Sequence, residues 1–126
     1  MKNPKSTISL LFLFFLLFSS CDKGEILVET GDLSDILTTT AKITGNVICI
    51  GDGIKHYGHC YSVTPGPTVL DLKTEYYAAI GVGTYTSFLQ GLEPGTRYYI
   101  RAYGRRDNII AYGTEVSFTT ASPVTP

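Results

Sequence analysis

The chain has no tryptophan, and only one methionine and two histidines occur among its 126 residues. It also lacks the short motifs that mark common active sites, since it has no G-x-S-x-G, no H-E-x-x-H and no glycine-rich phosphate loop ahead of a helix. The acidic residues are scattered over expected turns, and no two can be placed on one facing surface. These absences argue against an enzyme, and they leave a core of tyrosine, isoleucine, valine and leucine.

A stretch long enough to span a bilayer is also missing. The apolar run over residues 8–18, which contains a single serine, is shorter than the roughly 20 residues that a spanning helix needs. It follows Lys2 and Lys5 and precedes the sequence SSC, which is the arrangement of a secretory signal peptide over residues 1–20. A buried core helix is the alternative, but the run has no polar face to present to water.

The end of this run resembles the lipobox of bacterial lipoproteins. Phe18, Ser19 and Ser20 precede Cys21, and Phe18 stands where the family usually has leucine. The resemblance implies a diacylglyceryl group on the Cys21 thiol and a chain that is exported and lipid-anchored to the cell envelope. We expect the outer membrane, on its periplasmic or outer side. A plain signal peptide with cleavage near Ser20 is the alternative.

The remaining residues make one domain of ordinary size. We expect a tether over residues 21–25, the domain over residues 26–120 and a linker-like tail over residues 121–126, where the sequence ASPVTP has two prolines. Removing Lys2 and Lys5 from ten basic residues leaves eight against eleven acidic ones, a net charge of −3. That balance gives no support to nucleic-acid binding.

Alternating residues and turn signals dominate this domain. Residues 41–49 alternate between apolar and mostly polar positions, as expected for a strand with one buried face. The last strand is expected to place Tyr112, Thr114, Val116 and Phe118 on one face. Residues 70–79 are the only segment with a trace of helical periodicity. The other expected strands are residues 26–30, 56–63, 83–92 and 96–104, separated by turns such as GDG and TPGP. This pattern predicts an all-β sandwich or barrel.

The segment GLEPGTRYYIRAYG resembles the E–F corner of fibronectin type III domains. Leu92, Pro94, Gly95 and Tyr98, together with Thr96, occupy the family's L-x-P-G-T-x-Y positions. The resemblance covers roughly residues 26–120 and implies an immunoglobulin-like β-sandwich of about seven strands. It also implies a tyrosine corner, in which the Tyr98 hydroxyl bonds to nearby backbone.

Strand alternation after the corner predicts a face with binding residues. It directs Tyr98 inward and directs Tyr99, Arg101 and Tyr103 outward. In the resembled fold the strand of residues 56–63 is a neighbour, so His59 and Tyr61 are expected to extend the same outer face. Aromatic rings interleaved with His and Arg could hold a sugar or a peptide. The alternative is that these cross-strand pairs only stabilise the sheet.

The cysteines form an odd set of three. If Cys21 carries the lipid, Cys49 and Cys60 are a candidate disulfide, and two unpaired buried thiols are the alternative. His56 shares its strand parity with Cys60, but no second close ligand pair accompanies them, so we expect no metal site.

The sequence therefore predicts a membrane-anchored, non-catalytic envelope lipoprotein without a cofactor. Its expected role is a binding or adhesion module for a polysaccharide or protein partner. The alternatives are a structural spacer or remnant of a larger surface protein and, with least support, a small hydrolase.

Overall fold

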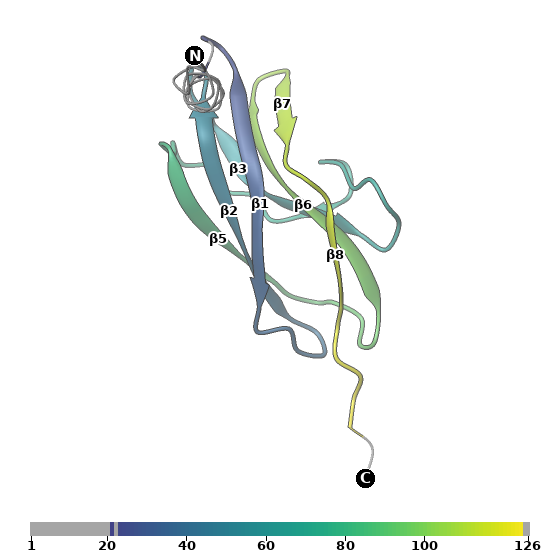
Figure 1. Cartoon of the computed structure of the whole chain (residues 1–126). Coiled ribbons are helices and arrows are strands. Elements are labelled where there is room, and N and C mark those ends of the chain that lie inside the picture. Colours follow the sequence, from purple (N-terminus) through teal and green to yellow (C-terminus); the bar gives the residue numbers. More distant parts are fainter. Residues whose placement is uncertain (1–20, 22, 125–126) are drawn as a thin grey trace, which may run out of the picture.

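The structure is a computed structural model that describes Cys21 and residues 23–124. The expected signal peptide therefore lies outside the described residues. Eight strands and no helix occur in the described part of the chain (Figure 1). Residues 70–79, which carry the trace of helical periodicity, form the end of a turn, strand β4 and irregular chain. The strands are β1 (Ile26–Ser34), β2 (Ala41–Ile50), β3 (His56–Ser62), β4 (Leu72–Lys73), β5 (Gly83–Leu89), β6 (Arg97–Arg106), β7 (Ile109–Tyr112) and β8 (Val116–Thr119).

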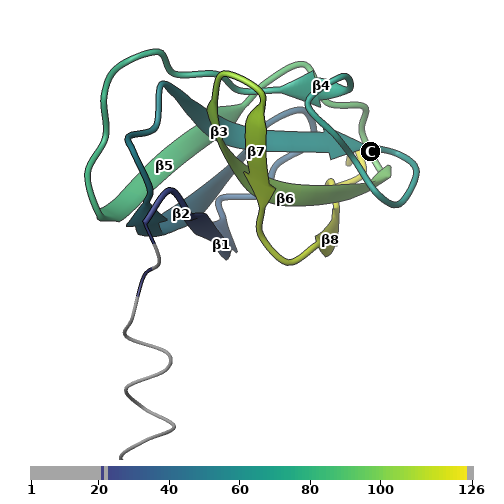
Figure 2. The same cartoon turned by 90° about the horizontal axis from the view of Figure 1, so that it is seen from above.

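The strands form two antiparallel sheets that pack face to face (Figure 2). One sheet has the order β1-β2-β5. The other has the order β4-β3-β6-β7, with β8 also paired to β6. We call them the three-stranded and the five-stranded sheet. The β-sandwich expected from the sequence is confirmed, with eight strands in place of about seven.

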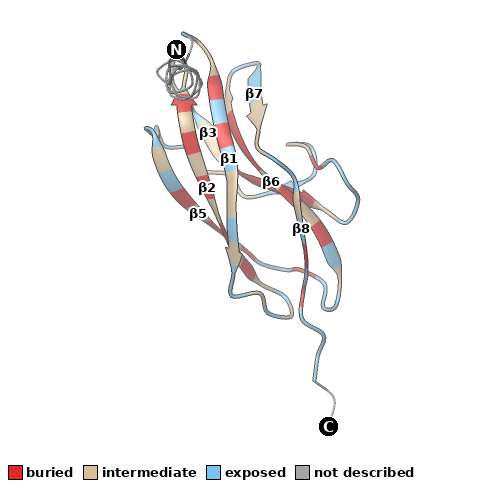
Figure 3. Cartoon of the chain, in the orientation of Figure 1, coloured by how far each residue is buried: buried red, intermediate tan, exposed pale blue. Residues whose placement is uncertain are grey.

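Strand β2 shows why these residues form a sandwich. Its buried positions alternate with half-buried ones along its whole length (Figure 3), so every second residue faces the space between the sheets. Ala41, Ile43, Val47 and Cys49 are buried, as the alternation predicts.

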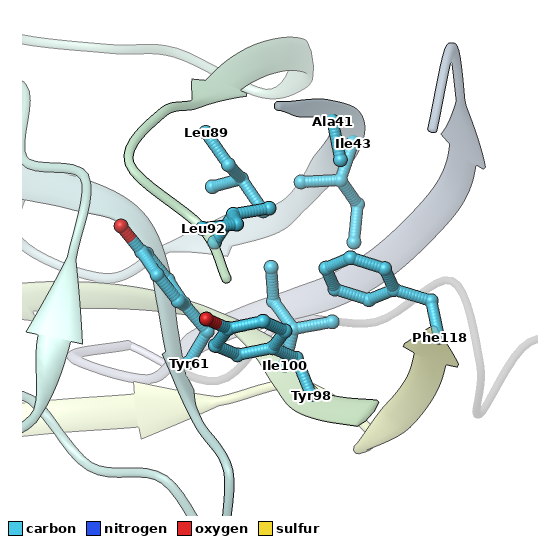
Figure 4. Close-up of a cluster of buried hydrophobic side chains, with 8 residues drawn as sticks. All are labelled: Ala41, Ile43, Tyr61, Leu89, Leu92, Tyr98, Ile100 and Phe118. Atoms are coloured by element: carbon cyan, nitrogen blue, oxygen red, sulfur yellow. The ribbon is translucent and has the colours of Figure 1, made fainter. Parts of the chain in front are cut away.

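The core below the E–F corner is built around tyrosine. Tyr98 stacks on Phe118 with a ring-centroid distance of 5.7 Å and contacts Tyr61 edge-on at 6.2 Å (Figure 4). The Glu93 N–H donates to the Tyr98 hydroxyl oxygen at 2.8 Å, so the tyrosine corner is confirmed. In this chain without tryptophan, Tyr61 is one of the large rings that fill the core.

The single last strand expected from the sequence is instead two strands, β7 and β8. Tyr112 pairs with Tyr103, and Phe118 pairs with Tyr98, and these partners lie on opposite faces of β6. Tyr112, Thr114, Val116 and Phe118 therefore do not share a face. At the break the Ala102 N–H finds no strand partner and donates to the Thr30 hydroxyl of β1 at 2.9 Å, which joins the two sheets along this edge.

The two ends of the sandwich have different neighbours. The described chain enters beside the start of β1 and leaves beyond β8, at the opposite end (Figure 1). At the entry end Gly24 packs on Gly51, where a Cβ atom would lie 2.9 Å from the Gly24 backbone. At the exit end the Ala121 N–H donates to the Leu37 carbonyl at 3.0 Å. No helix in the described part of the chain is long and apolar enough to cross a membrane.

Candidate functional site

The outer binding face expected from the sequence is not formed, because two of its five members point inward. His59 has no exposed surface, and Tyr61 is buried in the core cluster of Figure 4. In the register of β3 and β6, His59 lies opposite Ala102 and Tyr61 lies opposite Ile100, and both partners face the core. The prediction for His59 and Tyr61 was wrong by one strand position, which exchanges the two faces of β3.

A loop covers most of what remains of that face. Residues 63–71 fold over the five-stranded sheet, and the Pro67 carbonyl accepts a hydrogen bond from Arg101 Nε at 2.7 Å. The Arg101 guanidinium also stacks on the Tyr112 ring, 3.9 Å from its centroid. The Val69 N–H donates to the Tyr112 hydroxyl at 3.1 Å. Arg101 therefore holds the loop on the sheet.

Tyr103 points to the outer side of the sheet, as predicted, but it is covered as well. Only 1% of it is exposed, and its hydroxyl donates to the Thr74 carbonyl at 2.9 Å. Burial raises the pKa of the Tyr103 hydroxyl above its ordinary range. Tyr99 is half-buried, with the Arg97 guanidinium 5.7 Å from its ring centroid. The expected face thus keeps Tyr99 alone as an accessible aromatic side chain.

The expected disulfide between Cys49 and Cys60 is also wrong. Cys49 is bonded to Cys21 with a Cα–Cα distance of 5.7 Å, and Cys60 is a free, buried thiol. Because His59 and Tyr61 point inward, Cys60 points to the outer side of its sheet, where its Sγ lies 3.5 Å from the Pro67 carbonyl oxygen. The five-stranded sheet therefore separates Cys60 from Cys49.

A different set of side chains gathers on the outer face of the five-stranded sheet. Lys73 lies opposite Cys60, so alternation along the extended chain that follows directs Glu75 and Tyr77 outward too. His56 lies opposite Arg105 in the register of β3 and β6, on the same face as Cys60 and Tyr103. We call these five residues the His56 patch: Lys73, Glu75, Tyr77, His56 and Arg105.

Glu75 is the centre of this patch. Its carboxylate accepts a hydrogen bond from His56 Nδ1–H at 2.8 Å and one from the Tyr77 hydroxyl at 3.3 Å. Lys73 Nζ lies 3.9 Å from the same carboxylate. Burial by itself would raise the pKa of Glu75, but the His56 hydrogen bond and the nearby charges outweigh it, so this pKa is lowered. Glu75 is therefore an anion that fixes the imidazole with Nε2 directed away from it.

Tyr77 is exposed and Arg105 is half-buried, so both side chains keep surface that a ligand can contact. Tyr77 is 71% exposed, and its ring meets the His56 ring edge-on at 5.0 Å. Arg105 Nε is buried without a hydrogen-bond partner among the described residues. An exposed ring, a fixed imidazole and an incompletely bonded guanidinium on a rigid sheet can bind a partner.

A second feature lies on the other sheet, beside the loop between β1 and β2. A hollow of about 230 Å³ is lined by eight residues, of which Lys42 and Phe88 face each other across β2 and β5. Lys42 is already engaged, since it lies 3.4 Å from the Asp35 carboxylate and 5.9 Å from the centroid of the Phe88 ring. The hollow thus offers an exposed ring with a cation that is already paired.

Ser87 and His59 resemble a catalytic nucleophile and its base, but both are enclosed. Ser87 Oγ lies 2.7 Å from His59 Nδ1, within the range of a nucleophile and its base. Neither residue has any exposed surface, and His59 Nε2 donates to the Thr44 carbonyl at 3.0 Å. A substrate cannot reach this serine. The described residues also contain no group of three side chains that could hold a metal ion.

Sequence reasoning missed the patch for an identifiable reason. Lys73, Glu75 and Tyr77 alternate in the segment KTEYY, which is a strand signal, but the segment was interpreted as possible helix. His56 was considered only as a metal ligand beside Cys60. The pairing of Tyr57 with Tyr76 brings the two segments together, and nothing in the sequence specified it.

Comparison with solved structures finds the same fold at low sequence identity. The sensor domain of the anti-sigma factor RsgI4 from Pseudobacteroides cellulosolvens has a TM-score of 0.62 at 16% identity, over 78% of this chain and 76% of that chain. The human KIAA0970 fibronectin type III domain has a TM-score of 0.54 at 18% identity, over 100% and 89% of the two chains.

No family model and no curated protein matches the sequence. A redesigned β-sandwich is a further structural match, with a TM-score of 0.52 at 24% identity over 75% of this chain and 89% of that chain. At these identities the likeness is one of fold, so the chain is a fibronectin type III-like sandwich of two antiparallel sheets.

Proposed function

We propose that this protein is a non-catalytic recognition module that is anchored to the cell envelope and binds a polysaccharide or protein partner. The observation that carries the proposal is the His56 patch. Its imidazole is oriented by Glu75 at 2.8 Å, and its aromatic ring, Tyr77, is 71% exposed. Side chains fixed by a sheet and by hydrogen bonds lose little conformational entropy when they bind.

The fold supports a recognition role without naming a ligand. The RsgI4 domain is a sensor domain, so this sandwich serves for sensing in at least one bacterial protein. Function belongs to sites and not to folds, and for that reason the proposal depends on the patch.

The anchor in this proposal is a diacylglyceryl thioether on Cys21. In the structure the same sulfur is bonded to Cys49, and one sulfur cannot hold both groups. We assign the disulfide to unacylated chains and the thioether to anchored ones. Two or more acyl chains are needed for stable attachment, and the outer membrane remains the expected location.

Replacing Tyr77 tests the recognition role. The full chain, in mild detergent, is screened on a glycan array and in pull-downs from envelope extracts, together with Tyr77→Ala and Phe88→Ala. Phe88 is the matched control, because it is also an exposed ring, 62% accessible, but lies on the other sheet. We expect a partner that Tyr77→Ala loses and Phe88→Ala keeps.

A partner lost only in Phe88→Ala would move the site to the hollow of the three-stranded sheet. Binding by neither the native chain nor the variants would favour the structural spacer. The anchor is tested separately: Cys21→Ser should move the protein from the membrane fraction to the soluble fraction. An unchanged membrane fraction would refute acylation at Cys21.

A further inference from the structure

We propose that the His56 patch binds an acidic sugar, and that the carboxylate of a uronic acid lies between Arg105 and His56 while the sugar ring lies against Tyr77. This inference rests on the proposed recognition function and names the chemical class of its ligand. It depends on the charges of the patch and on the order of its side chains across the sheet.

The charges of the patch favour an anion. Lys73 and Arg105 are cations, and Glu75 is the only anion of the five residues. Glu75 is already engaged by His56, Tyr77 and Lys73, so its charge is largely compensated within the patch. Arg105 Nε has no hydrogen-bond partner among the described residues. That nitrogen is enclosed, but Arg105 as a whole is only half-buried, and a planar guanidinium binds a carboxylate better than it binds a neutral oxygen.

The register places the imidazole beside this guanidinium. His56 and Arg105 are directly opposite on neighbouring strands, which puts their Cβ atoms about 5 Å apart. Because Nδ1 of His56 donates to Glu75, Nε2 is the ring nitrogen left for the ligand. It can donate to a carboxylate when the imidazole is protonated and can accept from a sugar hydroxyl when it is neutral.

The exposed ring completes the recognition of a sugar. Tyr77 continues β4, so it lies two strand spacings from Arg105, or about 10 Å across the sheet. A pyranose has an apolar face of C–H groups and, in a uronic acid, a carboxylate at one edge. The patch offers an aromatic surface and a cation in that same order across the sheet.

The test is affinity electrophoresis of the full chain in non-ionic detergent through gels that contain one of three polymers. Polygalacturonate supplies the ring and the carboxylate. Its methyl ester supplies the ring alone, and poly-L-glutamate supplies the carboxylate alone. We expect retardation by polygalacturonate, with binding at least roughly tenfold weaker to each of the other two polymers.

Four variants test whether polygalacturonate binds at the His56 patch. Arg105→Gln and Tyr77→Ala should each weaken binding of polygalacturonate roughly tenfold or more, as expected for loss of a charge-assisted hydrogen bond or a stacked ring. Arg97→Gln and Phe88→Ala are the matched controls and should leave it unchanged. Thermal unfolding of each variant confirms that the fold is kept.

Three results would overturn the inference. Equal retardation by the methyl ester would mean that the carboxylate is not recognised, and equal retardation by poly-L-glutamate would mean that the sugar is not. Retention of binding in Arg105→Gln would show that the Arg105 guanidinium does not bind the ligand. In each case a partner that is lost in Tyr77→Ala would still support the recognition function, so the two proposals fail separately.

Discussion

His59 is a buried histidine that belongs to a closed set of hydrogen bonds. Its Nε2–H donates to the Thr44 carbonyl at 3.0 Å, so Nδ1 accepts from the Ser87 hydroxyl at 2.7 Å. The Thr74 hydroxyl lies 2.8 Å from Ser87 Oγ and accepts the His59 backbone N–H at 2.9 Å. Both ring nitrogens are therefore satisfied only when the imidazole is neutral.

This arrangement predicts a loss of stability in mild acid. Burial lowers the pKa of His59 from 6.5 to about 4, against the raising effect of the Thr44 hydrogen bond. The unfolded chain therefore binds this proton first, and falling pH favours unfolding between pH 6.5 and about 4. At about 1.4 kcal/mol for each pH unit, the loss reaches about 3 kcal/mol. Urea unfolding at several pH values measures it.

His56 gives the control for this prediction, because it is the other histidine and lies on the surface. The dependence on pH should persist in His56→Gln and disappear in His59→Gln. A native chain whose unfolding free energy is constant between pH 6.5 and 4.5 would contradict the assignment of a neutral, enclosed His59.

At the scale of elements, Gly58 determines how closely β4 can approach β3. A Cβ atom at this position would collide with the Thr74 carbonyl, the group that also accepts the Tyr103 hydroxyl. Next to it, the Tyr85 hydroxyl donates to the Gly58 carbonyl at 2.8 Å. A residue without a side chain is therefore required where β4 and its extension pack.

Gly58→Ala should destabilise the protein by about 1–3 kcal/mol, because the extension of β4 must move away from β3. The midpoint of thermal unfolding should fall by about 5 °C or more. Gly81→Ala is the matched control, since an added Cβ there meets no atom within 4 Å. Equal midpoints for the two variants would show that β4 is not packed as described.

The elements also show how far sequence alone could lead. Strand β2 was predicted correctly because only one of its faces is fully buried, so burial follows the alternation of its residues. The facing of Tyr98, Ile100 and Ala102 in β6 was also predicted correctly, although the burial of Tyr103 on its outer face was not. Strand β3 was not predicted correctly, because the loop of residues 63–71 covers its outer face and His59, Cys60 and Tyr61 are all buried. When both faces are covered, alternation no longer identifies the inner one.

The candidate site was lost for the same reason. The loop of residues 63–71 has no regular alternation that would indicate where it packs. Strand alternation therefore predicted that Arg101 and Tyr103 lie on an exposed face, but in the structure the loop covers that face. The pairing of β4 with β3 has only a two-residue strand as its signal, and that pairing brings Glu75 to His56.

At the scale of the molecule, the proposed acylation of Cys21 implies two forms of the chain. In one, a disulfide-bearing oxidant takes two electrons and the thiol protons of Cys21 and Cys49, and is itself reduced to two thiols. In the other, the Cys21 sulfur attacks the glyceryl carbon of a glycerophospholipid, the bond from that carbon to the phosphate oxygen breaks, the thiol proton and the phosphate head group leave, and Cys49 stays reduced. Cys60 is a free thiol in the structure and should remain one in both forms.

Counting thiols distinguishes the forms. After denaturation without reductant, maleimide should label the acylated, detergent-phase chain at Cys49 and Cys60, and the unacylated, aqueous-phase chain at Cys60 alone. Mass spectrometry of each phase reads the number of labels. Three labels on the aqueous chain would contradict the Cys21–Cys49 bond, and one label on the detergent-phase chain would show that Cys49 has another partner.

The entry and exit of the chain at opposite ends of the sandwich have a mechanical consequence. If the protein is held at Cys21 and its tail is pulled at the far end, tension runs along β1 and β8 and parallel to their lengths (Figure 1). The hydrogen bonds of β1 to β2 and of β8 to β6 are then loaded together in shear and not opened one after another. Such a domain resists forced unfolding through its unfolding rate, which would let it bear load between a membrane and a distant surface.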